Sequence, residues 1–159
     1  MDNADKKPVQ LEVLHFETTI DAGAEKVYET MLDKNHYAEW TAPFSPDSRF
    51  SGSWEKGTEI RFFGTDPDGN SGGMISRVRE NIPNKFVSLE PVGIIKEGEE
   101  ITSGPEIEEW AGTLENYTFS DSDGKTLLQV DMHIDPKWRG FMLETWPESL
   151  DILKKICER

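Results

Sequence analysis

The chain of 159 residues carries 31 acidic and 17 basic side chains, which gives a formal net charge of −14. Such a charge repels phosphate backbones and anionic lipid headgroups, so the composition argues against a nucleic-acid-binding or a membrane-bound protein. The length suits one domain with a core and a modest internal cavity.

The first ten residues are polar, and we expect a disordered tail over residues 1–10 followed by a single domain over residues 11–159. The tail lacks the apolar stretch of a signal peptide, and no apolar run is long enough to span a bilayer. These features indicate a cytoplasmic protein. The single cysteine, Cys157, excludes an internal disulfide, and its place on an apolar stripe favours a packed small side chain over a reactive thiol.

The first part of the domain predicts one strand and two short helices. Residues 11–20 alternate between apolar and polar side chains, which is typical of a strand. Helical spacing of the apolar residues between 24 and 33 predicts a helix, and a shorter one is expected over residues 34–40. The loop over residues 41–52 should fold over an apolar surface, because a solvated loop would not need Phe44 and Phe50.

The middle of the chain predicts antiparallel strands. Residues 58–63 and 73–80 flank a turn rich in Asp and Gly, which indicates a hairpin. A further strand over residues 85–95 should bend or bulge, because Pro91 and Gly93 interrupt it.

An acidic connector over residues 96–109 separates these strands from a last predicted hairpin, formed by residues 110–119 and 126–134. The second of these strands alternates most clearly. Its apolar face is predicted to comprise Thr126, Leu128, Val130, Met132 and Ile134.

The chain ends in an amphipathic helix predicted over residues 141–158. Its apolar residues recur at steps of three and four and are Met142, Trp146, Leu150, Leu153 and Cys157. Pro147 interrupts the hydrogen-bonding pattern, so we expect one helix with a bend. The element order predicts an α+β fold in which a curved antiparallel β-sheet wraps around the long C-terminal helix, with two short helices after the first strand.

This element order and several motifs resemble the activator of heat-shock protein 90 ATPase homologue-like family, within the SRPBCC (START-like, birch-pollen-allergen-like) helix-grip superfamily. The motifs are Tyr37-Ala-Glu-Trp40, Gly52-Ser-Trp54, Gly73-Met74, Ile82-Pro83, Trp110-x-Gly112-x-x-Glu115-x-Tyr117-x-Phe119 and the ending from Trp146 to Glu158. The resemblance implies a cavity between the sheet and the last helix that takes largely apolar small molecules such as sterols, polyketides or hormones. It supplies no shared catalytic motif. It implies the fold more than the co-chaperone activity, since the members that stimulate the chaperone carry an additional N-terminal domain.

Five tryptophans in this chain exceed what its core requires, and each indole N–H needs a partner when buried. A cavity with a few polar groups would supply such partners, whereas the alternative is that the aromatic residues simply fill the core. The predicted ligand-binding residues are Trp40, Phe44, Phe50, Trp54, Phe62, Met74, Trp110, Tyr117, Met142 and Trp146.

Candidates for catalysis are polar groups on predicted strands. His133 and Asp131 have the parity of the solvent face, whereas Glu115 and Tyr117 share the parity of Phe119 and could orient a ligand or act as acid or base. A structural role is the alternative, and it is the one we expect for Glu115. In that interpretation Glu115 pairs with a strand arginine, Arg61, Arg77 or Arg79, and its pKa falls.

No metal or other cofactor is predicted. His15, His36 and His133 lack ligand spacing, and the segment Asp66-x-Asp68-Gly69 is interpreted as a turn, because the bidentate Glu of a calcium loop is missing. Three functions stay open. They are a carrier or sensor of a small apolar molecule, a chaperone-associated interaction domain, and a cyclase-like or hydrolase-like enzyme using Glu115 and Tyr117. The chain is expected to be a monomer or a homodimer.

Overall fold

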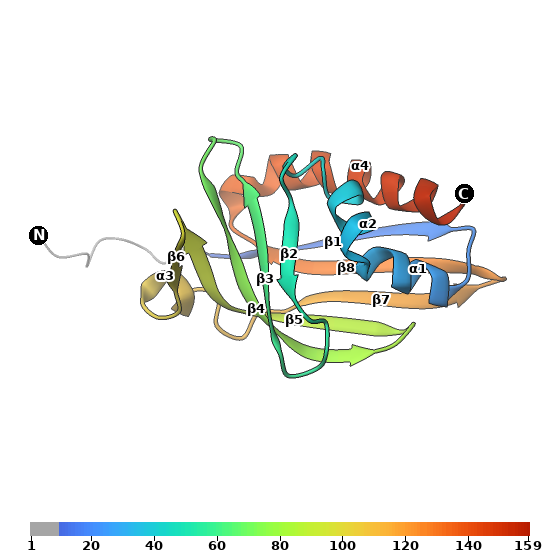
Figure 1. Cartoon of the computed structure of the whole chain (residues 1–159), viewed down its shortest axis with the longest axis horizontal. Helices are drawn as coiled ribbons and strands as arrows, with labels where there is room; N and C mark the ends of the chain where they lie inside the picture. The colour runs from blue at the N-terminus through green and yellow to red at the C-terminus, as the bar shows by residue number, and fades with distance from the viewer. Residues whose placement is uncertain (1–9) are drawn as a thin grey trace, which may run out of the picture.

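The computed structural model describes residues 10–159 and has one antiparallel sheet with helices packed on one face (Figure 1). The strands are β1 (Glu12–Ile20), β2 (Arg49–Gly52), β3 (Glu59–Thr65), β4 (Ser71–Ile82), β5 (Phe86–Lys96), β6 (Glu99–Ile101), β7 (Glu115–Ser122) and β8 (Lys125–Ile134). The helices are α1 (Ala24–Leu32), α2 (Lys34–Trp40), α3 (Pro105–Glu108), the 3-10 helix η1 (Pro136–Trp138) and α4 (Arg139–Cys157). The expected tail lies outside the described residues, apart from Gln10.

The strands run in the order β1-β8-β7-β5-β4-β3-β2, and β6 pairs with β5. The expected α+β helix-grip architecture is confirmed, because α1, α2 and α4 pack against one another and against the sheet. The alternation predicted for β8 is also confirmed. Its buried residues are Thr126, Leu128, Val130, Met132 and Ile134. β8 lies between β1 and β7, so its side chains point to the two faces of the sheet, and these buried residues all point to the same face.

The sheet curves where β4 and β5 pair irregularly. Their register shifts between Ile75 and Ser76 and again between Val78 and Glu80, and Pro91 pairs with Ser76 at the first shift. This confirms the interruption expected in β5, since a bulge bends a strand and increases its twist. The bend lets the sheet curve around the helices that pack on it.

The C-terminal helix α4 begins at Arg139, earlier than the sequence predicts, and continues through Pro147. The side chain of Asp135 accepts a hydrogen bond from the backbone N–H of Lys137 and so caps η1, which leads directly into α4. The buried face of α4 includes Trp146, Leu150, Leu153 and Cys157, as predicted. No helix among residues 10–159 is long and apolar enough to cross a membrane.

Two local predictions were wrong. Residues 110–114 do not form a strand, because Gly112 has a φ of 81° and the backbone N–H of Thr113 bonds to the carbonyl of Trp110 at 3.1 Å, which makes a turn. The segment Arg49–Gly52, expected to be loop, pairs with β3 as strand β2. The short strand β6 in the acidic connector was not anticipated either.

Candidate ligand-binding cavity

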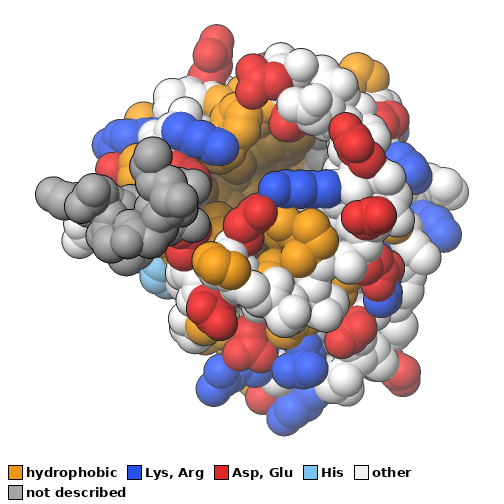
Figure 2. Space-filling model, turned by 90° about the vertical axis from the view of Figure 1, so that its left-hand side faces the viewer, with side chains coloured by type: hydrophobic (Ala, Val, Ile, Leu, Met, Phe, Trp, Pro, Cys, Tyr) orange, Lys and Arg blue, Asp and Glu red, His pale blue; other side chains and the backbone are white. Residues whose placement is uncertain are grey.

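A cavity of about 370 Å³ lies between the sheet and the first half of α4. Its walls come from α2, from strands β3, β4, β5, β7 and β8, and from η1 and α4. An open groove of about 810 Å³ along the β3–β4 turn shares lining residues with it, including Phe44, Phe62 and Met142. Figure 2 shows a hollow in the surface that is lined by hydrophobic side chains and has charged side chains around its rim.

Most of the predicted ligand-binding residues lie in the cavity wall. These are Trp40, Phe44, Phe62, Met74, Trp110, Tyr117, Met142 and Trp146. Phe50 and Trp54 do not line the cavity. Both pack on Tyr37, a residue of the wall, with ring centroids 5.1 Å and 6.4 Å from its ring. The structure therefore places Phe50 and Trp54 in a cluster with Tyr37 rather than in the cavity wall.

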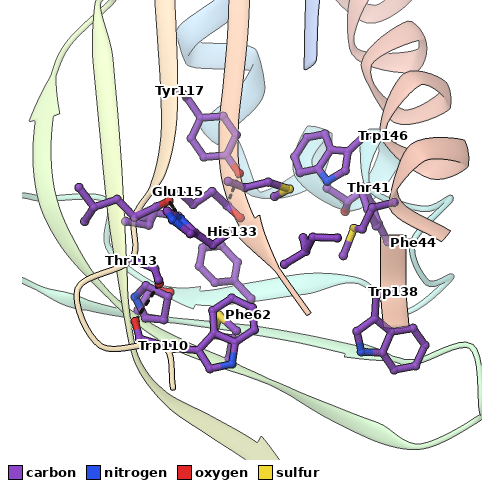
Figure 3. A pocket seen from close by; sticks show the side chains of 18 of the residues that line it. Thr41, Phe44, Phe62, Trp110, Thr113, Glu115, Tyr117, His133, Trp138 and Trp146 are labelled. Atoms are coloured by element: carbon purple, nitrogen blue, oxygen red, sulfur yellow. Dashed lines mark hydrogen bonds between the residues drawn. The ribbon is translucent and has the colours of Figure 1, made fainter. Parts of the chain in front are cut away.

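Trp146 occupies the centre of the aromatic wall. It is 4% exposed, and its ring lies 5.1 Å from Phe44, 6.0 Å from Trp40 and 6.4 Å from Tyr117, measured between ring centroids. Its Nε1 is buried and has no hydrogen-bond partner within residues 10–159, whereas Nε1 of Trp40 donates to the carbonyl of Met31 at 3.1 Å. In Figure 3 the nitrogen of Trp146 is turned toward Thr41, another residue of the wall.

An unpartnered buried N–H costs roughly 1–3 kcal/mol of desolvation. A hydrogen-bond acceptor that reached Nε1 would remove this cost for Trp146. Trp54 Nε1 also lacks a partner in the described part of the chain, but it belongs to the cluster around Tyr37 rather than to the cavity.

Glu115 and Tyr117 form a hydrogen-bonded polar pair in the cavity wall. The Tyr117 hydroxyl donates a hydrogen bond to the Glu115 carboxylate, and both residues line the wall (Figure 3). Burial raises the pKa of Glu115, and the hydrogen bond from Tyr117 opposes this only in part. Burial and the nearby Glu115 carboxylate also raise the pKa of Tyr117 and of Tyr37.

The expectation that Glu115 pairs with an arginine was wrong. The Nε of Arg61 lies 2.6 Å from Glu100, whereas Arg77 and Arg79 approach Glu90 at 3.6 Å and 4.0 Å. The reason is strand parity. Glu115 is opposite Leu89 in the β5–β7 register and shares its inner face, while the next residue, Glu90, faces outward with Arg77 opposite it.

His133 was expected in solvent, but it lies in the cavity wall, with its Nδ1 3.4 Å from the carbonyl oxygen of Leu114. The turn over residues 110–114 returns across this end of β8 and covers it, which the alternation along β8 does not reveal. Asp131, two residues earlier, does lie on the outer face, where it contacts His15 Nδ1 at 2.6 Å.

Sequence reasoning also missed Tyr37 and Trp138 as wall residues. Tyr37 precedes Trp40 by three residues on α2, so helical spacing places both on one face and could have identified it. Trp138 lies on η1, and no sequence pattern marked it. Residues 10–159 contain no group of acidic, His or Cys side chains that could hold a metal ion. The Asp66 carboxylate accepts the backbone N–H groups of Asp68 and Asn70, as expected of a turn.

A curved antiparallel sheet around a C-terminal helix, with an aromatic-lined cavity between them, defines a helix-grip domain. The family described as Activator of Hsp90 ATPase homolog 1-like protein has a sequence model that matches residues 21–158, and the chain belongs to this family. No match was found among the curated proteins.

Solved structures share the fold at low sequence identity. The solution structure of the Aha1 dimer from Colwellia psychrerythraea is 21% identical, with a TM-score of 0.66 over 92% of this chain and 96% of that one. A protein from Arthrobacter aurescens is 13% identical, with a TM-score of 0.69 over 95% and 92% of the two chains. CalU16 from Micromonospora echinospora is 14% identical, with a TM-score of 0.59 over 92% and 76%. At these identities the likeness concerns the fold alone.

Proposed function

We propose that this protein binds a small, largely apolar molecule in the cavity between the sheet and α4, as a carrier or sensor. The observation that carries the proposal is Trp146, a residue of the cavity wall whose buried N–H has no partner among the described residues. Nearly all buried polar groups in native proteins have a hydrogen-bond partner. A ligand with an acceptor atom would provide one here.

The size and lining of the cavity support the same conclusion. Small-molecule sites are concave, span roughly 300–1,000 Å³ and combine an apolar wall with a few polar groups. The cavity of about 370 Å³ lies in this range, and the polar groups Glu115, Tyr117 and Trp146 interrupt a mainly aromatic and aliphatic wall. The adjoining groove offers a route of entry.

The test is the binding of N-phenyl-1-naphthylamine, a neutral apolar fluorophore, followed by native mass spectrometry. We expect one probe per chain. Ser76→Phe should abolish binding, because Ser76 is 3% exposed and lines the cavity, so that a larger side chain fills the space. Ser51→Phe is the matched control, since Ser51 is exposed on β2 and lines neither the cavity nor the groove. Equal binding by both variants would contradict the proposal.

A co-chaperone-like role is a second candidate, and the family supports it. The family description names an activator of the Hsp90 ATPase, and the Colwellia psychrerythraea structure is that of an Aha1 dimer. The direct measurement is the ATPase rate of Hsp90 with and without this chain. Stimulation would support the role, and an unchanged rate at saturating concentration would contradict it. Light scattering separates the monomer from a homodimer.

Acid catalysis is a third candidate, favoured by one observation. Burial raises the pKa of Glu115, and a carboxyl with a raised pKa suits a general acid near neutral pH. The mass of a molecule recovered from the protein after incubation separates this role from binding alone. A carrier returns its ligand unchanged.

A further inference from the structure

We propose that the cavity selects an organic cation, an amine whose ammonium group pairs with the Glu115 carboxylate while its apolar body lies against the aromatic wall. This inference rests on the proposed binding function and adds the charge of the ligand to it.

The described lining of the cavity contains Glu115 and Asp135 but no Lys or Arg. The arginines on the neighbouring strands are engaged on the outer face of the sheet, where Arg61 meets Glu100 and Arg77 meets Glu90. A carboxylate removed from water without a cation is costly, and a cation brought to it removes much of that cost. The described cavity wall thus carries the negative charge of its carboxylates without a Lys or Arg side chain to neutralise it.

Glu115 is faced from each neighbouring element by groups that supply no fixed positive charge. Tyr117 on β7 donates its hydroxyl hydrogen to Glu115, and the Tyr37 phenol on α2 is near enough for its pKa to be raised by the Glu115 charge. The remaining titratable wall residues are His133 on β8 and Asp135 just beyond it. Across the strand pair, β5 presents the apolar side chain of Leu89, and α4 presents Met142 and Trp146.

The aromatic wall is suited to an ammonium group. The rings of Tyr37 and Phe62 lie 5.9 Å apart, and those of Tyr117 and Trp146 lie 6.4 Å apart, in the same wall as Glu115. Cations are attracted to aromatic faces within about 6 Å of the ring centroid, most strongly where water is excluded. The net charge of −14 also raises the local concentration of cations and repels anions such as fatty acids.

The experiment compares 2-(2-naphthyl)ethylamine with 2-(2-naphthyl)ethanol, which has nearly the same shape and no charge. Each competes with bound N-phenyl-1-naphthylamine at pH 8. We expect the amine to bind about ten- to a hundred-fold more tightly, as for a hydrogen bond between charged groups. Glu115→Gln should abolish this preference, so that amine and alcohol bind with similar affinity. Glu90→Gln, which removes a carboxylate from the outer face of β5, should retain it.

The native chain gives an independent test if Glu115→Gln fails to fold. Only the deprotonated carboxylate attracts the ammonium group, so the affinity for the amine should rise as the pH rises through the raised pKa of Glu115. Where this carboxyl is still protonated, binding of the amine should release its proton. The affinity for the alcohol should show no such rise. If amine and alcohol bind equally at pH 8, the cation inference is overturned and the binding function stands. If neither compound nor the fluorophore binds, the binding function is overturned as well.

Discussion

Tyr117 donates the hydrogen of its hydroxyl group to the carboxylate of Glu115, two residues earlier on the same face of β7. Tyr117 is 6% exposed, and Glu115 is half-buried in the wall of the cavity. A carboxyl group in this position is held by a neutral donor rather than by a cation. This arrangement determines how the protein should respond to pH.

Glu115 should make the folded state less stable as the pH rises. Its pKa is raised in the folded chain, so the folded state binds this proton more tightly than the unfolded state does. The resulting loss of stability begins near the unfolded value of about 4.3 and is complete above the raised pKa. Glu115→Gln should therefore gain stability relative to the native chain as the pH rises above about 4.3, measured by urea unfolding. Glu90→Gln should show no such gain.

Tyr117→Phe should raise the pKa of Glu115 further, because the hydrogen bond from Tyr117 is the interaction that lowers it. The ¹³C chemical shift of the Glu115 carboxyl, followed by NMR against pH, measures this directly. Loss of the bond should also destabilise the fold by about 1–3 kcal/mol, since the partner remains desolvated. A fall in the pKa of Glu115 would show that another group holds the carboxylate.

Leu150→Ala tests the packing of α4 on the sheet. Leu150 is 3% exposed, so truncation should lower the free energy of unfolding by about 2–5 kcal/mol. Leu143→Ala on the same helix is the matched control, because Leu143 is 45% exposed and its loss should change stability by less than about 0.5 kcal/mol. Similar costs for the two variants would contradict the orientation of the helix.

Gly73→Ala tests the close approach of β3 and β4. A Cβ atom at Gly73 would lie 1.9 Å from the carbonyl oxygen of Phe62, so the two strands would have to separate. We expect a strong loss of stability in thermal unfolding. Gly140→Ala, in the first turn of α4 with no atom within 4 Å of the new Cβ, should instead stabilise the chain by about 0.5–1 kcal/mol. Equal effects of the two substitutions on stability would contradict the close approach of β3 and β4 at Gly73.

The outline of the fold was predictable because its longest elements have strong periodicity. The alternation along β8 and the three- and four-residue steps along α4 identify the two surfaces that enclose the interior. The turn over residues 110–114 and the strand β2 were not predictable in this way. Both are short. The turn depends on the positive φ of Gly112, and β2 becomes a strand only by pairing with β3.

The site was predictable in composition and less so in geometry. Eight of the ten chosen residues, six of them aromatic, line the cavity, whereas Phe50 and Trp54 pack on Tyr37 outside the wall. The partner of Glu115 was predicted wrongly. The environment of Glu115 depends on the register between β5 and β7, which places Leu89 rather than an arginine opposite it. The alternation of residues along each strand does not determine the register between the two strands.

The most direct test of the binding cavity is the quenching of tryptophan emission by N-phenyl-1-naphthylamine in two single variants. Trp146 lines the cavity, whereas Trp54 has a similarly buried indole nitrogen in the cluster outside it. We predict that Trp146→Phe removes a large part of the quenching and that Trp54→Phe leaves it nearly unchanged. A saturable signal that depends on Trp54 and not on Trp146 would contradict the assignment of the cavity as the binding site.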